Sequence, residues 1–307
     1  MKALITGING FVGKHLEYFL KDRADVFGTS RIDHSERNIF KLCLLSEFDT
    51  VRLIEKVKPT HIFHLAGLSN VKESWENKEA FIQGNVIGTI NLLEAVRKVD
   101  KNIRVITVGS SEEYGIVPKG IEKVHEEIPL SPINPYGISK SAISMLIKLY
   151  NKSYGLDVIH ARPFNHIGPG QRLGFVTTDF AYQIAMINKR KTQGNRMSIG
   201  NLEAIRDFTD VRDIVEAYYQ LGQYGEAGEI YNICTGKGIS IQSILNTLLS
   251  FSTVDIEIVI DSQKIRVSDI QSLVGDPKKL SQLTAWKPKR TIENTLEDIY
   301  NYWMINL

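Results

Sequence analysis

Short apolar runs alternate with helical patterns through the first half of the chain. We expect strands over residues 2–6, 25–29, 61–65 and 104–108, and helices over residues 11–22, 48–57 and 80–99. Strands and helices that alternate in this way are typical of βαβ units, which build a parallel sheet with helices on both faces. The pattern therefore predicts an α/β fold with a doubly wound parallel sheet.

The pattern changes after a stretch rich in proline and glycine at residues 163–174. Beyond it we expect helices over residues 180–188, 213–221 and 241–249, an extended segment over 206–211 and a strand over 230–233. Periodicity alone leaves open whether residues 230–233 return to the first sheet. We assign residues 1–164 to the domain of the parallel sheet, rejoined by about residues 204–235. Residues 165–203 and 236–307 are assigned to a smaller mixed α/β lobe.

The composition excludes several classes of function. The 307 residues carry a formal net charge of +2, and 43% are hydrophobic. This charge is too small for a general nucleic-acid or membrane surface. No apolar run approaches the ~18 residues of a membrane span, and no leader pattern precedes the first strand. We expect no nucleic-acid partner, no membrane association and a cytoplasmic location. Cys43 and Cys234 lie in apolar stretches without metal-binding spacing, so we predict buried, inert thiols and no metal site.

A glycine-rich turn joins the first expected strand to the first expected helix. It contains Gly7, Asn9, Gly10, Phe11, Val12 and Gly13. Glycines permit a tight turn and a close backbone approach to a diphosphate, and the helix N-terminus offers free N–H groups to that anion. In this strand–turn–helix context the spacing predicts a dinucleotide site. A tight turn that binds no ligand is the alternative.

The end of the second expected strand bears on the choice of cofactor. An NAD site usually has a carboxylate here for the ribose 2′-hydroxyl, but the run Val26–Arg31 contains no acidic residue. Thr29 and Ser30 can donate hydrogen bonds to a 2′-phosphate, and Arg31 can pair with it in a bidentate manner. The run favours NADP(H), with NAD(H) as a further cofactor. The competing interpretation is that Arg31 is a solvated loop residue.

Three side chains are candidates for catalysis. Tyr136 and Lys140 are four residues apart at the start of an expected helix, so both project from one face. A neighbouring ammonium favours the phenolate and would lower the tyrosine pKa. Ser110 follows an expected strand, where its hydroxyl can hydrogen-bond a substrate carbonyl. The competing interpretations are surface decoration for the Tyr/Lys pair and a helix cap for the serine.

Several segments together resemble a known family. They are TGINGFVG, HLAG, SSEEYG, Tyr136-x-x-x-Lys140 and RPFNHIGPGQ, and over nearly the whole chain they resemble the extended short-chain dehydrogenase/reductases. GNLEAIRDFTDVRD and LVGDPKKL…WKP narrow the resemblance to enzymes of GDP-6-deoxyhexose metabolism. Among these, the chain resembles the GDP-4-keto-6-deoxy-D-mannose reductases first and the GDP-mannose 4,6-dehydratases next.

The resemblance implies an architecture and a reaction. The fold would be a Rossmann domain with a smaller substrate lobe, and the protein would be a homodimer joined by a four-helix bundle. Helices 80–99 and 138–154 would supply its apolar residues, including Ile87, Ile90, Leu93, Ile143, Ile147 and Tyr150. A GDP-linked deoxysugar would be the substrate, and NADPH would reduce its 4-keto group, giving GDP-D-rhamnose or the C4 epimer GDP-6-deoxy-D-talose.

The resemblance also implies roles for individual residues. Ser110, Tyr136 and Lys140 would be catalytic, with Tyr136 as the acid and Lys140 also holding the nicotinamide ribose. Leu65, Ala66 and Pro163 would line the cofactor site. The substrate side would include Ser111, Glu112, Asn165, Val176, Asn201, Glu203, Arg206, Arg266 and Asp269.

Three departures and two rival functions accompany the resemblance. Cys43 replaces an acidic residue expected near adenine, Asn70 stands where Ser or His is usual, and Val267 stands where a proline usually follows the arginine. Glu112 lies where the dehydratase keeps its elimination base, so a 4,6-dehydratase is the first rival. A catalytically silent NADP-binding sensor is the second, although such a protein has no need of an acid beside the nicotinamide.

Overall fold

A seven-stranded parallel sheet forms the centre of the molecule. The computed structural model describes residues 1–34, 38–192, 194–261 and 270–307. The sheet has the order β10-β6-β5-β4-β1-β2-β3. Its strands are β1 (Lys2–Thr6), β2 (Asp25–Ser30), β3 (Ile39–Lys41), β4 (His61–His64), β5 (Arg104–Val108), β6 (Val158–Pro163) and β10 (Ile230–Ile233). The direction in which strands are added reverses beside β1, and ligands of open α/β sheets bind outside the carboxyl ends of the strands at such a point.

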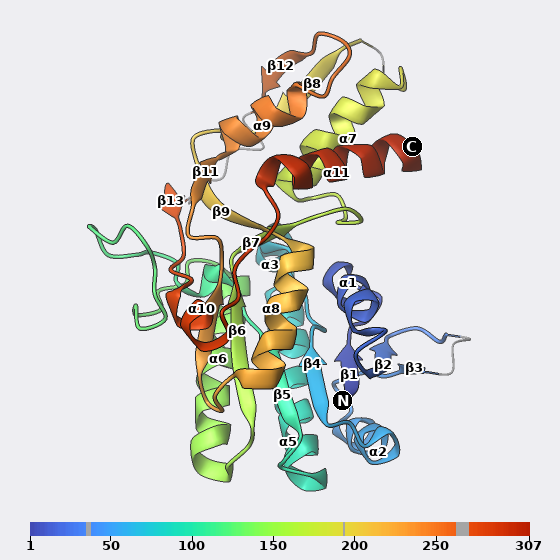
Figure 1. The fold of residues 1–307 in the computed structure, drawn as a ribbon, viewed down its shortest axis with the longest axis vertical. Coiled ribbons are helices and arrows are strands. Elements are labelled where there is room, and N and C mark those ends of the chain that lie inside the picture. Colours follow the sequence, from blue (N-terminus) through green and yellow to red (C-terminus); the bar gives the residue numbers. More distant parts are fainter. Residues whose placement is uncertain (35–37, 193, 262–269) are drawn as a thin grey trace.

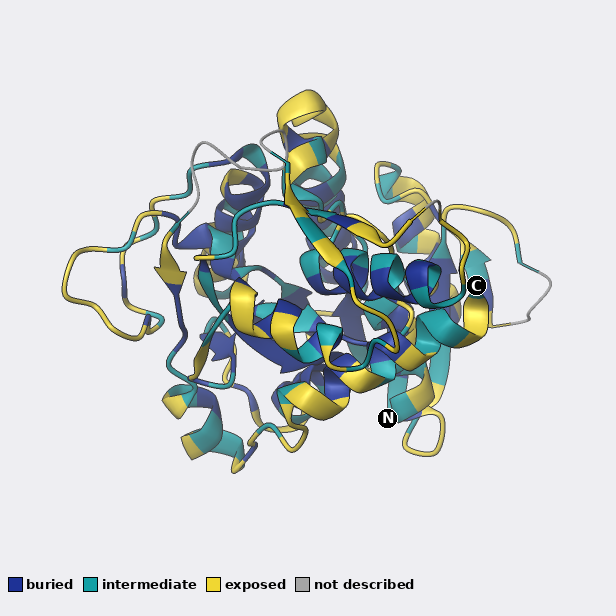
Figure 2. Ribbon diagram, turned by 90° about the horizontal axis from the view of Figure 1, so that it is seen from above, coloured by how far each residue is buried: buried dark blue, intermediate teal, exposed yellow. Residues whose placement is uncertain are grey.

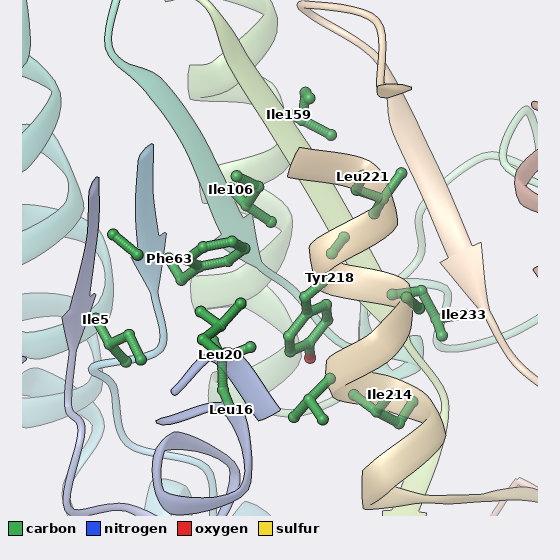
Figure 3. Packing of buried hydrophobic residues seen from close by; sticks show 14 of the residues in the cluster. Ile5, Leu16, Leu20, Phe63, Ile106, Ile159, Ile214, Tyr218, Leu221 and Ile233 are labelled. Atoms are coloured by element: carbon green, nitrogen blue, oxygen red, sulfur yellow. The ribbon is translucent and has the colours of Figure 1, made fainter. Parts of the chain in front are cut away.

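Helices cover both faces of this sheet. On one face α1 (Phe11–Leu20) and α8 (Val211–Tyr224) pack on the strands through Leu16, Leu20 and Tyr218 (Figure 3). On the other face lie α2 (Glu47–Val57), α5 (Gly88–Val99) and α6 (Pro135–Tyr154). The helices bury the sides that face the sheet and expose the opposite sides (Figure 2). The structure thus has the predicted α/β architecture.

A smaller mixed lobe lies at the carboxyl ends of the strands (Figure 1). It contains β7 (Asn165–Ile167), β9 (Ile205–Asp210), β11 (Gly238–Ser240) and β13 (Ser272–Leu273) in one sheet, and β8 (Arg196–Ile199) paired with β12 (Glu257–Ile260). Its helices α7 (Val176–Asn188), α9 (Ile241–Leu249) and α11 (Ile292–Asn306) share a second hydrophobic core. α10 (Lys278–Thr284) packs instead against the core of the large sheet through Leu280.

The chain returns to the large sheet after entering the lobe. β10 pairs with β6, whereas β9 belongs to the small sheet, so the return begins with α8. The helix expected over residues 80–99 is interrupted. It consists of α4 (Lys78–Phe81), a π-helix η1 (Ile82–Ile87) and α5, and a short α3 (Val71–Glu76) precedes it. Cys234 is buried as predicted, but the prediction for Cys43 was wrong, because it lies exposed just after the edge strand β3.

None of the helices in the described part of the chain combines the length and the apolar character that a membrane span requires.

Candidate active site

The glycine turn is packed so tightly that side chains are excluded at its key positions. Gly7 has φ +74°, and a Cβ there would lie 2.9 Å from the Cα of Ala66. A Cβ at Gly13 would lie 2.5 Å from the carbonyl oxygen of Gly7. The N–H groups of Gly7 and Ile8 both donate to the Thr29 carbonyl, which fixes the turn to the end of β2. The result is a bare backbone cradle at the N-terminus of α1, which fits a diphosphate.

The residues after β2 form a polar cluster beside this cradle. Ser30 is half-buried and Arg31 is exposed. The His34 Nε2 lies 3.2 Å from the Ser30 Oγ and 2.6 Å from the Asn9 Nδ2. The structure therefore brings together Asn9 and Ser30, which the sequence predicted at the cofactor site. It also adds His34, for which the loop sequence gave no signal.

The three catalytic candidates converge at the carboxyl end of β5. Lys140 Nζ donates to the Val108 carbonyl at 2.8 Å and lies 6.0 Å from the centroid of the Tyr136 ring. The Ser110 hydroxyl is in hydrogen-bonding reach of Tyr136. Both Tyr136 and Lys140 are 8% exposed. The trio that the sequence placed on a helix and a separate strand end is thus assembled in one place.

The electrostatics of the trio differ from the expectation in one respect. Burial raises the pKa of Tyr136, and the carboxylates of Glu112 and Glu113 raise it further, so it is not lowered as expected. The expectation was wrong because the Lys140 ammonium bonds the Val108 carbonyl and is itself affected by burial. Burial lowers the pKa of Lys140 to about 8, and Glu113 opposes that shift. In this structure Tyr136 holds its proton through the neutral range.

The segment after β5 is held in shape by its own side chains. Ser110 caps the short 3₁₀-helix η2 (Ser111–Glu113), and Glu113 bonds back to the Ser110 N–H, which completes a capping box. The capping alternative and the catalytic interpretation of Ser110 are therefore compatible. Ser111 is buried and Glu112 is half-buried. Glu112 Oε2 accepts from the Asn134 Nδ2 at 2.7 Å, and Asn134 also caps α6 through the Gly137 N–H.

Two buried polar residues beside the trio were missed by the sequence analysis. Asn85, in the π-helix, accepts from the Leu68 N–H at 2.7 Å and donates to the Ser139 hydroxyl at 2.9 Å. Glu113 is 0% exposed and bonds partners on β6. Asn85 could have been found from the sequence, because it is a polar residue on the side of a helical pattern that is otherwise expected to be buried. Glu113 was noticed only as part of SSEEYG.

The remaining predicted residues fall into two groups. Leu65 and Ala66 directly follow β4, and their N–H groups donate to Thr6. Pro163 ends β6 and is buried. On the lobe side, Asn165 starts β7, Val176 starts α7, Arg206 lies in β9, and Asn201 accepts from the Glu203 N–H at 2.9 Å. Arg266 and Asp269, like Val267, lie outside the described residues. Within those residues, no group of three or more His, Cys, Asp or Glu side chains is placed to hold a metal ion.

Comparison with known proteins gives the chain a family. Residues 4–299 match the family model described as GDP-mannose 4,6 dehydratase. The chain belongs to this family. As part of the extended short-chain dehydrogenase/reductases, the family accounts for the Rossmann fold, the glycine turn and the Tyr136/Lys140 pair seen here.

The similar proteins cover the whole length of the chain. A GDP-6-deoxy-D-mannose reductase of Pseudomonas aeruginosa PAO1 is 34% identical over 302 residues, which are 98% of this chain and 97% of that protein. A GDP-6-deoxy-D-talose 4-dehydrogenase of Aggregatibacter actinomycetemcomitans is 32% identical over 313 residues, covering 100% of this chain and 99% of that one. The solved structure of RMD from Pseudomonas aeruginosa, complexed with NADPH, is 33% identical with a TM-score of 0.89 and covers 100% of both chains.

Proposed function

We propose that this protein is a sugar-nucleotide oxidoreductase that uses NADPH to reduce the 4-keto group of GDP-4-keto-6-deoxy-D-mannose to GDP-D-rhamnose. The observation that carries the proposal is the convergence of Ser110, Tyr136 and Lys140 beside a bare glycine cradle. A proton donor, a second hydroxyl and an ammonium at one site are the groups that reduction of a ketone requires.

The cofactor site supports a dinucleotide with a 2′-phosphate. The cradle of Gly7, Gly10 and Gly13 would hold the diphosphate at the N-terminus of α1. Ser30 and Arg31 would bind the 2′-phosphate, since β2 ends in Thr29 and Ser30 without an acidic residue. The relative of known structure was solved with NADPH. We therefore propose NADP(H) as the cofactor, with NAD(H) used less well; when bound, NADPH supplies the hydride.

The chain's own residues would manage the proton and the charge. Tyr136 holds its proton because burial raises its pKa, so it is ready to donate to the oxygen forming at C4. Ser110, in hydrogen-bonding reach of Tyr136, would hold the same oxygen and orient the carbonyl. Lys140, with a pKa of about 8, carries its ammonium near neutrality and would stabilise negative charge on Tyr136 after the proton has left.

The substrate class is supported by the names of the relatives. The reductase and the dehydrogenase that are 34% and 32% identical are both named for GDP-6-deoxyhexoses. The lobe at the carboxyl ends of the strands would grip the nucleotide. Asn165 would contact the diphosphate and Arg206 a phosphate or ribose, with Val176, Asn201 and Glu203 nearby. From the sequence alone, Arg266 and Asp269 would also lie on the nucleotide side of the site.

A GDP-mannose 4,6-dehydratase is the second candidate, and Glu112 favours it. Its carboxylate is half-buried, is fixed by Asn134 and faces Tyr136 closely enough to raise the pKa of that tyrosine. A carboxylate here is necessary for elimination of water but not sufficient, because that reaction also oxidises C4 and returns hydride to C6. In the reductase, Glu112 would be a polar wall of the pocket.

Two parallel assays distinguish the candidates. Purified protein receives GDP-4-keto-6-deoxymannose with NADPH in one assay, and GDP-mannose with NADP⁺ in the other. The proposal expects consumption of NADPH in the first, and no loss of water by mass spectrometry in the second. Steady formation of the 4-keto-6-deoxy product from GDP-mannose would overturn the reductase assignment and make Glu112 the catalytic base.

A further inference from the structure

Glu113 is a buried carboxylate at the base of the catalytic segment, and three hydrogen bonds and an ion pair hold it. Oε1 accepts from the Ser110 backbone N–H at 2.8 Å and from His160 Nε2 at 3.0 Å. Oε2 accepts from Arg162 Nε at 2.9 Å, and the ion pair brings Arg162 Nη2 within 2.8 Å of the same oxygen. The Ser110 backbone, the His160 ring and the Arg162 guanidinium are each fixed within the fold, so they hold the carboxylate in one position.

The backbone of the catalytic segment packs directly on this carboxylate. A Cβ at Gly109 would lie 2.0 Å from Glu113 Oε1 and 2.2 Å from His160 Nε2. The Ser110 N–H is bonded to the same oxygen. Because Ser110 is tied through its own backbone, the direction in which its hydroxyl points toward Tyr136 depends on Glu113.

Glu113 keeps its negative charge inside the protein. Although burial alone would raise its pKa, His160, Arg162 and the Ser110 N–H lower the pKa to about 2. Burial lowers the pKa of His160, and Glu113 opposes that shift. The ring lies between two partners, with Nε2 3.0 Å from Glu113 Oε1 and Nδ1 2.9 Å from the Thr107 Oγ1. The pair of Glu113 with Arg162 is therefore ionised at all pH values at which the enzyme works.

Glu113 and Lys140 bind neighbouring residues at the end of β5: Lys140 Nζ donates to the Val108 carbonyl, and Glu113 accepts from the Ser110 N–H. The other titratable groups facing Lys140 are Tyr136 on α6, His64 on β4 and His160 on β6. Burial lowers the pKa of both histidines, that of His64 to about 3, and Tyr136 holds its proton, so these three groups are neutral. Glu113 is the group that opposes the effect of burial on Lys140.

We propose that Glu113 is a positioning residue for the reduction: its carboxylate aims Ser110 through the backbone, and its negative charge lies at the same strand end as the Lys140 ammonium. The inference rests on the proposed function for its kinetic part. Its electrostatic part rests on the shared strand end and on the pKa of Lys140, which Glu113 raises against the effect of burial. A plain structural ion pair between Glu113 and Arg162 would stabilise the fold but leave the titration of Lys140 and the chemical step unaffected.

The test uses Glu113→Gln, which keeps the shape and removes the charge. The titration of Lys140 is followed by NMR on protein with ¹³C,¹⁵N-labelled lysine, and its signal is identified by its absence in Lys140→Arg. We expect the pKa of Lys140 to fall in Glu113→Gln. At a pH well below that titration, we expect kcat to fall roughly 10- to 100-fold, the scale of loss that a misplacement of about 1 Å causes, while the NADPH Kd is unchanged.

Glu113→Asp separates the two roles. It keeps the charge, so the pKa of Lys140 should stay at the wild-type value. It is one methylene too short to hold both Ser110 and Arg162, so kcat should still fall. The matched control is Glu126→Gln, because Glu126 is a half-buried carboxylate that, like Glu113, accepts a backbone N–H, that of Asn232 at 2.8 Å, but does not contact the trio. We expect it to change neither quantity.

A Glu113→Gln protein with a lower melting temperature but an unchanged Lys140 titration and kcat would overturn the proposal. If Glu113→Gln does not fold, an unchanged kcat in Glu113→Asp would overturn it instead. Wild-type protein that fails to turn over the keto-sugar would refute the proposed function, and the NMR titration would still test the electrostatic part.

Discussion

At the scale of single residues, the decisive feature is a tyrosine that keeps its proton. A free phenol titrates near ~10, and in this structure burial raises the pKa of Tyr136 further. A reductase begins with the protonated acid, so this state suits the reaction in the direction of reduction. The catalytic role of Lys140 then begins when the proton leaves, since its ammonium offsets the charge on the phenolate.

We expect Tyr136→Phe to lose most turnover while NADPH binding is nearly unchanged. The change removes the hydroxyl that donates the proton, but it removes little contact with the cofactor. General acid catalysis contributes roughly 10²–10⁴-fold to a rate, and kcat should fall on that scale. The matched control is Tyr150→Phe on the same helix, whose hydroxyl bonds Glu94 instead. A Tyr136→Phe protein that keeps more than about half of the wild-type kcat contradicts the assignment.

We expect Arg31 to contribute to a preference for NADPH over NADH. A hydrogen bond to a charged group contributes about 1.5–3 kcal/mol, and because Arg31 is exposed, solvent weakens it. We expect Arg31→Ala to lower the NADPH/NADH ratio of kcat/KM by roughly tenfold or less. Arg23→Ala, at another exposed arginine, should leave the ratio unchanged. If Arg31→Ala also leaves it unchanged, Arg31 is a solvated loop residue.

At this scale the sequence located the trio but not its surroundings. Ser110, Tyr136 and Lys140 could be placed because their positions follow from a strand end and a helical spacing. His34 and Asn85 could not, because a loop conformation and a π-helix bring them to the site. The pKa of Tyr136 was mispredicted because spacing does not report burial.

At the scale of elements, Asn134 links the stability of α6 to the site. Its side-chain oxygen caps the helix that carries Tyr136 and Lys140, and its amide holds Glu112. We expect Asn134→Ala to lower the free energy of unfolding by about 1 kcal/mol, as for a lost cap, and to lower kcat/KM as well. Ser46→Ala removes the equivalent cap of α2 far from the site. It should lose similar stability without losing activity; equal losses of activity in both would contradict the account.

The helices α5 and α6 remain the expected dimer interface, but four of the six side chains expected there lie elsewhere. Leu93, Ile143, Ile147 and Tyr150 are buried against the large sheet, whereas Ile87 and Ile90 are half-buried. The exposed face of α6 instead presents Ile138, Met145 and Leu149, which are 50%, 63% and 54% exposed. Helical spacing could not tell these two faces apart, because α6 carries apolar residues on both.

We expect the protein to be a dimer at micromolar concentration and the double variant Met145→Glu/Leu149→Glu to be a monomer, because two charges would be buried in the interface. Light scattering gives the mass directly. Phe48→Glu, at an apolar residue of α2 that is 68% exposed, should leave the dimer intact. Wild-type protein with the mass of one chain would count against the interface.

The elements also show where sequence patterns fail. β6 is an interior strand of the sheet, yet its sequence Val158–Pro163 contains His160 and Arg162 and does not read as an apolar run. Both are tolerated because the Glu113 carboxylate pairs with each of them inside the protein. We predicted one continuous helix over residues 80–99 because the apolar pattern runs on through the π-helix. The pattern does not show that the π-helix has wider turns than an α-helix. The strands β1, β2, β4, β5 and β10 were found because each contains a short run rich in β-branched and aromatic residues.

At the scale of the whole molecule, we propose that the sheet supplies the chemistry and the lobe supplies recognition. The glycine cradle and the trio lie at the carboxyl ends of β1, β4 and β5. The residues proposed for the nucleotide lie on β7, α7 and β9, which pack around a separate core. This division explains how one fold can host several reactions on nucleotide sugars: the face of the sugar that meets the hydride depends on how the lobe holds it.

The central claim is reduction at C4, and the stereochemistry of the product tests it most directly. The purified protein is incubated with GDP-4-keto-6-deoxymannose and NADPH, and the product is identified by NMR. The account predicts stoichiometric consumption of NADPH and a single product, GDP-D-rhamnose. GDP-6-deoxy-D-talose would contradict the proposed product, and recovery of unchanged keto-sugar with no NADPH consumed would contradict the account as a whole.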